Sequence, residues 1–303
     1  MNITDSQVHI WEAHRPDRPW DPDEVHAPVF VAVPGARPHR EAPISAEEMN
    51  SLMDGAGVTR AVIVPPSPTG DDNLTALEAA AKYPDRYTVM GRFNPAAPGA
   101  RDRLPTWLSQ PGMSGIRMTF HKPKWSPWLD NDEIDWFWAD CERLGIPLML
   151  LLPGRMDVVD RVARRHPGLA LIVDHMGRRS QLRNDECFAD LEELLALSRL
   201  PNVSVKASSA PCYSTQEYPF PGLTPHLQRI FDSFGPRRTF WGSDVSRLQC
   251  SYKQAVDHFL HELDFLKGED KEFVMGRALS DLLRWPMTTA AAATSNKSKE
   301  TYA

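Results

Sequence analysis

The sequence lacks the features that mark several large classes of protein. It has no run of the roughly 18 apolar residues that a membrane-spanning helix requires. Its first five residues contain neither the basic segment nor the apolar segment of a secretory signal. Positive charge is not in excess, because the formal net charge is −6. We therefore expect a cytoplasmic protein with no membrane and no nucleic acid among its main partners.

Cysteine is scarce, and two common catalytic motifs are missing. The four cysteines are far apart and form no CxxC pair: Cys141, Cys187, Cys212 and Cys250. In a chain without a secretory signal they are expected to be reduced thiols. No GxGxxG follows the first apolar strand, which disfavours a dinucleotide-binding sheet. No GxSxG is present, which disfavours a serine hydrolase.

Apolar runs alternate with helical segments along the chain. The eight strand-like runs are at 4–11, 60–66, 87–93, 114–120, 146–153, 169–175, 203–207 and 239–244. The helices expected between and after them are at 45–56, 72–82, 100–109, 130–144, 157–165, 187–199, 225–234, 252–266 and 269–283. Strict alternation indicates a parallel sheet. Eight such units predict a single (β/α)8 TIM barrel, with an open doubly wound sheet as the alternative.

Two stretches depart from this alternation. Residues 12–43 contain seven prolines, which exclude a regular helix. This Pro-rich insertion after the first strand is expected to be an active-site lid or binding loop, or else a surface loop or a contact in a homodimer. The barrel is assigned to residues 1–286. Residues 287–303, rich in Ala, Thr, Ser and Lys, are expected to be a disordered tail.

Polar residues stand at the ends of most predicted strands. In a TIM barrel the active site lies at the carboxyl ends of the strands. The candidates selected by this rule are Gln7, His9, Ser67, Arg92, Arg117, His121, His175, Arg178, Lys206, Cys212, Tyr213, Asp244 and Arg247. Imidazole and carboxylate groups transfer protons or bind metals, so His9, His175 and Asp244 are the main catalytic candidates.

Other polar and aromatic residues give weaker expectations. Lys206 is expected either to contact substrate or to pair with Asp174 or Asp244. His258 and His261 are expected to be an exposed pair on an outer helix. Four tryptophans are expected in the core or in a subunit contact rather than as a sugar platform: Trp125, Trp128, Trp136 and Trp138.

Four short motifs together resemble the amidohydrolase-2 branch of the amidohydrolase superfamily. They are Gln7-Val8-His9, Asp174-His175-Met176-Gly177, Trp241-Gly242-Ser243-Asp244 and Val274-Met275-Gly276-Arg277-Ala278. The resemblance implies a (β/α)8 barrel related to 2-pyrone-4,6-dicarboxylate lactonases and sugar-acid lactonases. It equally implies a relationship to zinc- or manganese-dependent decarboxylases and hydrolases.

The first motif departs from the family pattern His-x-His, because Gln7 stands in place of the first histidine. An amide oxygen is a weak ligand for zinc, whereas a neutral imidazole is a strong one. His9, His175 and Asp244 would still supply three ligands. The resemblance therefore leaves open a single divalent metal, zinc or manganese, and does not require one.

The resemblance implies hydrolysis of a small carboxylated lactone. Asp244 would act as general base on water, and His9, His175 and Gln7 would stabilise the oxyanion. The residues assigned to substrate binding are Gln7, Arg117, Arg178 and Tyr213, the arginines because guanidinium groups bind carboxylates bidentately. The alternatives are a metal-dependent decarboxylase of an aromatic or muconic acid, an amide or hydantoin hydrolase, and an inactive ligand-binding relative.

Overall fold

The computed structural model describes residues 1–21, 39–40, 42–120 and 125–285. Most of the predicted Pro-rich insertion, the candidate His121 and the predicted C-terminal tail lie outside these ranges. No described helix has the length and apolar character needed to cross a membrane. All four cysteines are free thiols, as expected.

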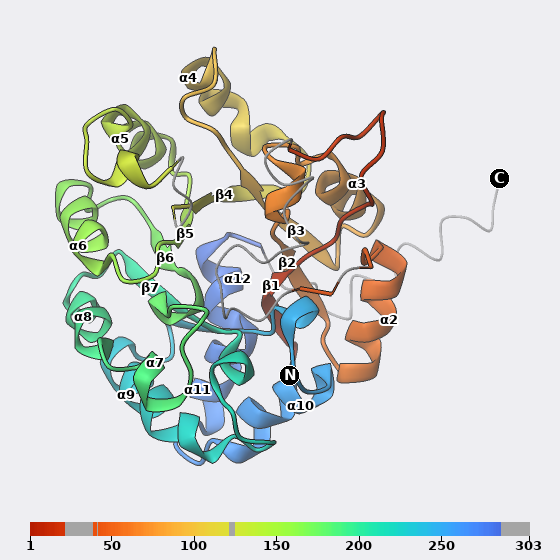
Figure 1. Cartoon of the computed structure of the whole chain (residues 1–303), viewed down its shortest axis with the longest axis vertical. Coiled ribbons are helices and arrows are strands. Elements are labelled where there is room, and N and C mark those ends of the chain that lie inside the picture. The colour runs from red at the N-terminus through yellow and green to blue at the C-terminus, as the bar shows by residue number, and fades with distance from the viewer. Residues whose placement is uncertain (22–38, 41, 121–124, 286–303) are drawn as a thin grey trace, which may run out of the picture.

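Eight parallel strands pair in sequence order and form a nearly closed barrel (Figure 1). They are β1 (Thr4–Val8), β2 (Arg60–Ile63), β3 (Tyr87–Arg92), β4 (Met113–Thr119), β5 (Leu148–Leu151), β6 (Leu171–Val173), β7 (Val203–Ser208) and β8 (Thr239–Gly242). Just beyond β8, the amide of Asp244 donates to the carbonyl of Gln7 at 2.9 Å and joins the last strand to the first. The predicted TIM barrel is confirmed.

Five helices between the strands lie close to their predicted positions. They are α2 (Ala46–Ala56), α3 (Leu74–Lys82), α5 (Asp135–Leu144), α6 (Met156–Arg165) and α9 (Thr224–Phe234). The start of α5 was predicted at 130–131, but the α-helix begins only at Asp135.

The other predicted helices are broken into short pieces. The region 100–109 is α4 (Ala100–Arg103) followed by a 3-10 helix that contains Pro105. The predicted helix at 187–199 is instead α7 (Asn184–Cys187), α8 (Leu191–Leu195) and a 3-10 turn. In place of the two predicted closing helices there are three short α-helices, α10 (Tyr252–Asp257), α11 (Gly268–Glu272) and α12 (Ala278–Leu282), with π-helical turns at His258–Glu262 and Phe273–Arg277.

The barrel interior is apolar at the end opposite the strand carboxyl ends. The buried apolar residues of this region come from alternate strand positions and from the last helical segment, and include Val62, Met90, Met149, Ile172, Phe240, Phe273 and Leu279. The segment ending in α12 packs against the start of β1, where Gly276 approaches Thr4. The C-terminal helix therefore covers the amino-terminal end of the barrel, and the functional groups gather at the other end.

Asp5 joins the first strand to the last. Its carboxylate accepts hydrogen bonds from the amides of Gln7 and Ser243, both at 2.9 Å, from the Ser243 hydroxyl, and from the Tyr252 hydroxyl at 2.6 Å. Asp5 is fully buried. Burial raises its pKa above the ordinary value despite these four donors. This carboxylate therefore holds β1, β8 and α10 in register.

The predicted exposed histidine pair on the outer helix is wrong for one member. His261 is exposed, but His258 is buried and packs edge-on against Phe220 and Phe259. Neither ring nitrogen of His258 has a hydrogen-bond partner among the described residues. Burial lowers its pKa to about 4, so at neutral pH the ring is uncharged.

Candidate active site

Three residues at the carboxyl ends of β6, β7 and β8 have left-handed backbone conformations. The φ angles are 51° at His175, 59° at Ser209 and 55° at Asp244. This conformation costs a residue with a side chain about 1–2 kcal/mol, and such residues concentrate at functional sites. The side chains of His175 and Asp244 meet there, with Nε2 at 3.9 Å from Oδ2. The left-handed backbone thus brings together two of the three main catalytic candidates, His175 and Asp244.

Asp244 is a buried carboxylate with one oxygen bonded and one unbonded. Oδ2 accepts from the Ser209 hydroxyl at 2.7 Å and from Arg247 at 3.5 Å. Oδ1 has no hydrogen-bond partner among the described residues, although His9 Nε2 lies 3.1 Å away. Burial alone would raise the pKa of Asp244, but the nearby histidines and Arg247 outweigh it and hold this pKa well below the usual range. Asp244 is therefore an anion at any working pH.

His9 presents a nitrogen lone pair to Asp244. Its Nδ1 lies 2.6 Å from the carbonyl of Val64. A carbonyl oxygen can only accept, so Nδ1 carries a proton. The amide nitrogen of Gln7 lies 3.3 Å from Nε2 and donates to it. In the neutral ring, Nε2 carries a lone pair and faces Asp244 Oδ1, which is also an acceptor. A proton or a metal cation between these two atoms would stabilise the arrangement.

His39 joins this group from the end of the Pro-rich insertion. One ligand atom each of His9, His39 and Asp244 lie within 4.8 Å of one another. The His39 ring stands edge-on to that of His9 at 4.9 Å, and its Nδ1 shares a hydrogen bond with Ser246 Oγ at 2.7 Å. Burial lowers the pKa of His39 well below its ordinary value. Sequence reasoning missed His39, because it selected the insertion as a binding loop without selecting a residue in it.

The donor set fits a divalent metal ion. Two neutral imidazoles and a carboxylate are the ligands that catalytic zinc sites use. The buried Asp244 Oδ1 has no hydrogen-bond partner among the described residues, and such an ion would satisfy it. His9 Nε2, 3.1 Å away, would be the neighbouring ligand in place of its hydrogen bond from Gln7. The predicted ligand trio is brought together as well, since His175 lies beside the same carboxylate. Burial lowers the pKa of His175 to about 3, so its ring is neutral, and its Nδ1 shares a hydrogen bond with the Ser208 hydroxyl at 2.8 Å.

A buried charge cluster lies next to this group. Lys206 Nζ pairs with Asp174 at 2.9 Å and donates to Gln7 Oε1. Arg117 pairs with the other oxygen of Asp174 at 3.0 Å and donates to Thr119 at 2.6 Å. Burial would raise the pKa of Asp174, but the two cations outweigh it and lower the pKa to about 2. Of the two expected partners of Lys206, the one with which it forms a salt bridge is therefore Asp174.

Two further predicted substrate-binding residues make other contacts. Arg178 donates to the carbonyls of Met176 at 2.8 Å and Cys187 at 3.0 Å, and pairs with Asp190 at 2.5 Å. Tyr213 is buried in the turn after β7, and burial raises its pKa. The contacts of Arg178 are with its own loop and with the α7–α8 region. A role in substrate binding stays a prediction for both residues.

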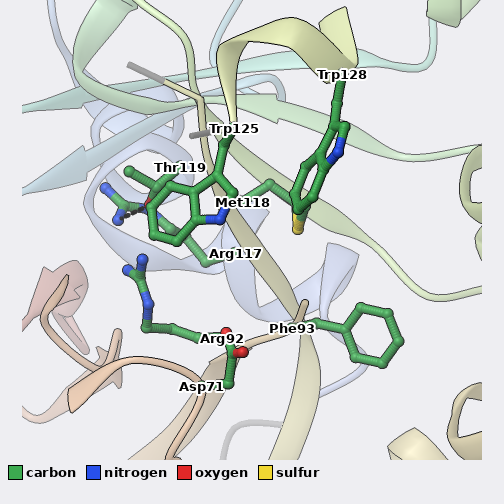
Figure 2. A pocket seen from close by; sticks show the side chains of 8 residues that line it. All are labelled: Asp71, Arg92, Phe93, Arg117, Met118, Thr119, Trp125 and Trp128. Atoms are coloured by element: carbon green, nitrogen blue, oxygen red, sulfur yellow. Dashed lines mark hydrogen bonds between the residues drawn. The ribbon is translucent and has the colours of Figure 1, made fainter. Parts of the chain in front are cut away.

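A pocket opens at the carboxyl ends of β3 and β4 (Figure 2). Its cavity volume is about 10 Å³, room for about one water molecule, and the remaining space is open to solvent. Its lining residues are Asp71, Arg92, Phe93, Arg117, Met118, Thr119, Trp125 and Trp128. Two of the four tryptophans expected in the core or a subunit contact thus border a pocket, whereas Trp138 is buried as expected.

Comparison with known sequences establishes the family. The family model described as Amidohydrolase matches residues 4–293, almost the whole chain. The chain belongs to the amidohydrolase family. This confirms the predicted family and the prediction that the protein is an enzyme.

Individual relatives support the same placement of this amidohydrolase. An L-fucono-1,5-lactonase of Burkholderia ambifaria is 26% identical over 254 residues, which cover 80% of this chain and 81% of that protein. An amidohydrolase from Burkholderia multivorans, solved with bound zinc, superposes with a TM-score of 0.77 at 19% identity, over 94% of this chain and 100% of that one. A probable 2-pyrone-4,6-dicarboxylic acid hydrolase from Acinetobacter baumannii, solved with citric acid bound, gives 0.71 at 20% identity, with the same coverage. The two structural likenesses show the shared fold.

Proposed function

We propose that this amidohydrolase hydrolyses a small carboxylated lactone, with Asp244 as the general base. The observation that carries the proposal is the unbonded Asp244 Oδ1, which belongs to a buried carboxylate at the mouth of the barrel with His9 beside Oδ1 and His175 beside Oδ2. The relatives described as a fucono-lactonase and a pyrone-dicarboxylic acid hydrolase support a lactone as the substrate.

The proton transfers follow from the positions of the side chains. Water attacks the lactone carbonyl while Asp244 Oδ1 accepts its proton, and the carbonyl oxygen becomes an oxyanion. We assign the hydrogen bond between His175 Nδ1 and the Ser208 hydroxyl to the tautomer in which the hydroxyl donates, so that the proton of the neutral ring is on Nε2 and stabilises this oxyanion. The ring C–O bond then breaks, and Asp244 returns the proton to the leaving alkoxide. The low pKa of Asp244 keeps the base ionised before each turnover.

The metal-type donor set has a defined place in this proposal. His9, His39 and Asp244 would hold a divalent ion, with His175 beside them. Such an ion, when bound, supplies Lewis-acid polarisation of the carbonyl. Without the ion, the amide nitrogen of Gln7 donates to His9 Nε2, and Lys206 holds the Gln7 oxygen. An ion bound through this ring nitrogen would replace that hydrogen bond, because Nδ1 carries the ring proton.

Replacement of Asp244 tests the proposal. Asp244→Asn removes the base and keeps the shape of the side chain, so we expect lactone hydrolysis to fall by at least 100-fold. Acid release from a panel of carboxylated lactones, followed by pH-stat, measures this. Asp140→Asn is the matched control, because Asp140 is also buried but pairs with Arg101 and Arg143 on the outer layer. A near wild-type rate in Asp244→Asn would remove Asp244 from the reaction.

A metal-dependent decarboxylase of an aromatic or muconic acid is the second candidate. The observation that favours it is the His9–His39–Asp244 donor set, which resembles a metal centre more than a simple acid–base pair. Elemental mass spectrometry of protein purified without chelator separates the two readings when combined with a CO2-release assay. About one zinc or manganese per chain together with CO2 release would replace the lactonase proposal by this one.

A further inference from the structure

We propose that Arg92 and the indole ring of Trp125 form the subsite that binds the carboxylate of a flat, ring-bearing substrate. The inference rests on the proposed function, because it names the group by which the hydrolysed lactone is recognised. It assigns this recognition to the β3–β4 side of the mouth, where the pocket of Figure 2 lies.

Arg92 is a buried cation that lacks partners for part of its side chain. It is the last residue of β3 and is 4% exposed. Its backbone is fixed, since its amide donates to the side chain of Asn73 at 2.7 Å and its carbonyl accepts from that side chain at 2.9 Å. Nε and Nη1 of the guanidinium have no hydrogen-bond partner among the described residues. A buried and unsatisfied guanidinium destabilises a fold unless a ligand satisfies it.

The charges around Arg92 favour an anion. Arg117 lines the same pocket, and Lys206 lies behind it. Both of these cations pair with the single buried carboxylate of Asp174, so Arg92 adds a third positive charge. Burial, and after it the proximity of Arg117, lower the pKa of Arg92 to about 9, which leaves the group charged at neutral pH. Asp71 lies beside the Arg92 side chain (Figure 2), and Asp71 and Asp21 act on the pKa of Arg92 in the opposite direction, raising it without outweighing burial and Arg117.

The aromatic wall defines the rest of the ligand. The guanidinium carbon of Arg92 lies 5.5 Å from the centre of the Trp125 ring, and Trp128 stands next to it along the pocket. Figure 2 shows the arginine side chains of positions 92 and 117 ending on the side of the pocket that Trp125 borders. An indole face packs against a flat ring, while a guanidinium binds a carboxylate through two parallel hydrogen bonds. A carboxylate attached to a planar or nearly planar ring satisfies both groups at once.

The subsite is connected to the catalytic groups through the buried charge cluster. Arg117 pairs with Asp174, the residue directly before His175. A ligand anchored at Arg92 therefore extends from β3 across the mouth toward the strands that carry His9, His175 and Asp244. In this arrangement, the carboxylate is held on one side and the reacting carbonyl on the other.

Binding of a non-hydrolysable probe tests the subsite without turnover. The probes are 1,3-benzenedicarboxylate and its uncharged diamide, titrated by calorimetry into the protein as purified. We expect the wild type to bind the dicarboxylate at least 10-fold more tightly than the diamide. Arg92→Met should abolish this preference, and Arg92→Lys should retain only part of it. Arg101→Met is the matched control, because Arg101 also lies 5.5 Å from a tryptophan ring, that of Trp136, but is exposed on α4.

Thermal unfolding supplies a readout that a purely structural arginine would not give. Without ligand, Arg92→Met should unfold at the same temperature as the wild type or higher, because it removes a buried charge that lacks partners. A lowered unfolding temperature together with unchanged probe binding would show a structural role and overturn the inference. Equal wild-type affinity for the dicarboxylate and the diamide would overturn it too. If Arg92→Met fails to fold, Arg92→Lys decides.

The failure of this inference differs from the failure of the proposed function. If the probe binds through Arg92 but no lactone is hydrolysed, the subsite stands and lactone hydrolysis is wrong. If charged and neutral lactones are hydrolysed equally, and Arg92→Met changes neither KM, lactone hydrolysis stands and the subsite is wrong.

Discussion

Gln7 lies between a buried ammonium and a ligand-type imidazole. Lys206 bonds its oxygen, which turns the amide nitrogen toward His9 Nε2. In metal-dependent relatives the resemblance places a histidine at this position. Here the Gln7 amide and the Lys206 ammonium lie next to His9. The positive charge on this side of the mouth is therefore that of a lysine side chain.

Gln7→His should strengthen metal binding, but only in part. A second imidazole adds a strong nitrogen ligand, while the ammonium of Lys206 next to it repels a cation. We therefore expect the zinc affinity to rise further in Gln7→His/Lys206→Met than in Gln7→His alone. Asp174 remains paired with Arg117 in the double variant. Competition with a chromophoric chelator measures both affinities. Equal zinc binding by the parent and both variants would contradict the strand geometry around Gln7.

Site residues that lie at the carboxyl end of a strand could be predicted from the sequence. His9, His175 and Asp244 come directly from the rule that barrel active sites lie at strand carboxyl ends, and they lie together. His39 did not follow from that rule, because its position depends on the path of a loop that has no periodic pattern. The ion pair of Arg178 with Asp190 could not be predicted either, because the sequence does not show which acidic residue an arginine contacts in the fold.

His258 makes stability depend on pH. Its pKa is about 4 in the folded protein and 6.5 in an unfolded chain, so the unfolded state binds more protons between these values. Stability is therefore lost as the pH falls through this window, by about 2 kcal/mol from pH 7 to pH 5. His258→Phe should remove this part of the loss in urea unfolding at the two pH values. His261→Gln, on the exposed neighbour, should keep it, and equal slopes in both variants would contradict the assignment.

At the scale of elements, helices with clear end signals were the predictable ones. Ser45 accepts a hydrogen bond from the amide of Glu48 at 3.1 Å, and Gly57 ends α2 with a φ of 77°. A serine at the N-cap and a glycine at the C-cap are sequence signals for the two ends of a helix. The closing helices were predicted as continuous, but each contains a π-helical turn. Such turns arise from tertiary packing, here the burial of His258 and the contact of Gly276 with β1, and have no local sequence signal.

The hydrogen bond from Tyr252 to Asp5 ties α10 to the barrel. Tyr252→Phe leaves the buried carboxylate with one donor fewer, and we expect the free energy of unfolding to fall by about 1–3 kcal/mol. Tyr83→Phe is the control, because the Tyr83 hydroxyl bonds the exposed Glu47 at 3.0 Å, and its loss should change stability by less than about 0.5 kcal/mol. Urea unfolding measures both variants. A similar small change in the two would show that Asp5 does not depend on Tyr252.

At the scale of the whole molecule, the two ends of the described chain meet beneath the barrel. Gly276 comes so close to β1 that a Cβ atom there would lie 2.7 Å from the amide nitrogen of Thr4. The motif around Gly276 was recognised in the sequence as a family feature. Its physical reason, a close approach of backbone to backbone, appears only in the folded chain. The predicted homodimer stays a prediction.

Gly276→Ala should separate these two segments. We expect a loss of about 1–3 kcal/mol in stability, because the extra methyl group forces a backbone shift. Gly55→Ala is the matched control: Gly55 lies in α2 with nothing within 4 Å of its Cβ position, so alanine there should stabilise by about 0.5–1 kcal/mol. Differential scanning calorimetry distinguishes the two. A rise in unfolding temperature for both variants would show that the β1 contact tolerates a side chain.

The hydrogen bonds of the Asp5 carboxylate that join β1 to β8 can form only late in protein synthesis. Its partners Ser243 and Tyr252 are translated 238 and 247 residues later. Until they emerge from the ribosome, the growing chain is an open parallel sheet with two unpaired edges, which are prone to pair with other chains. Closure of the barrel thus cannot precede the last fifth of translation.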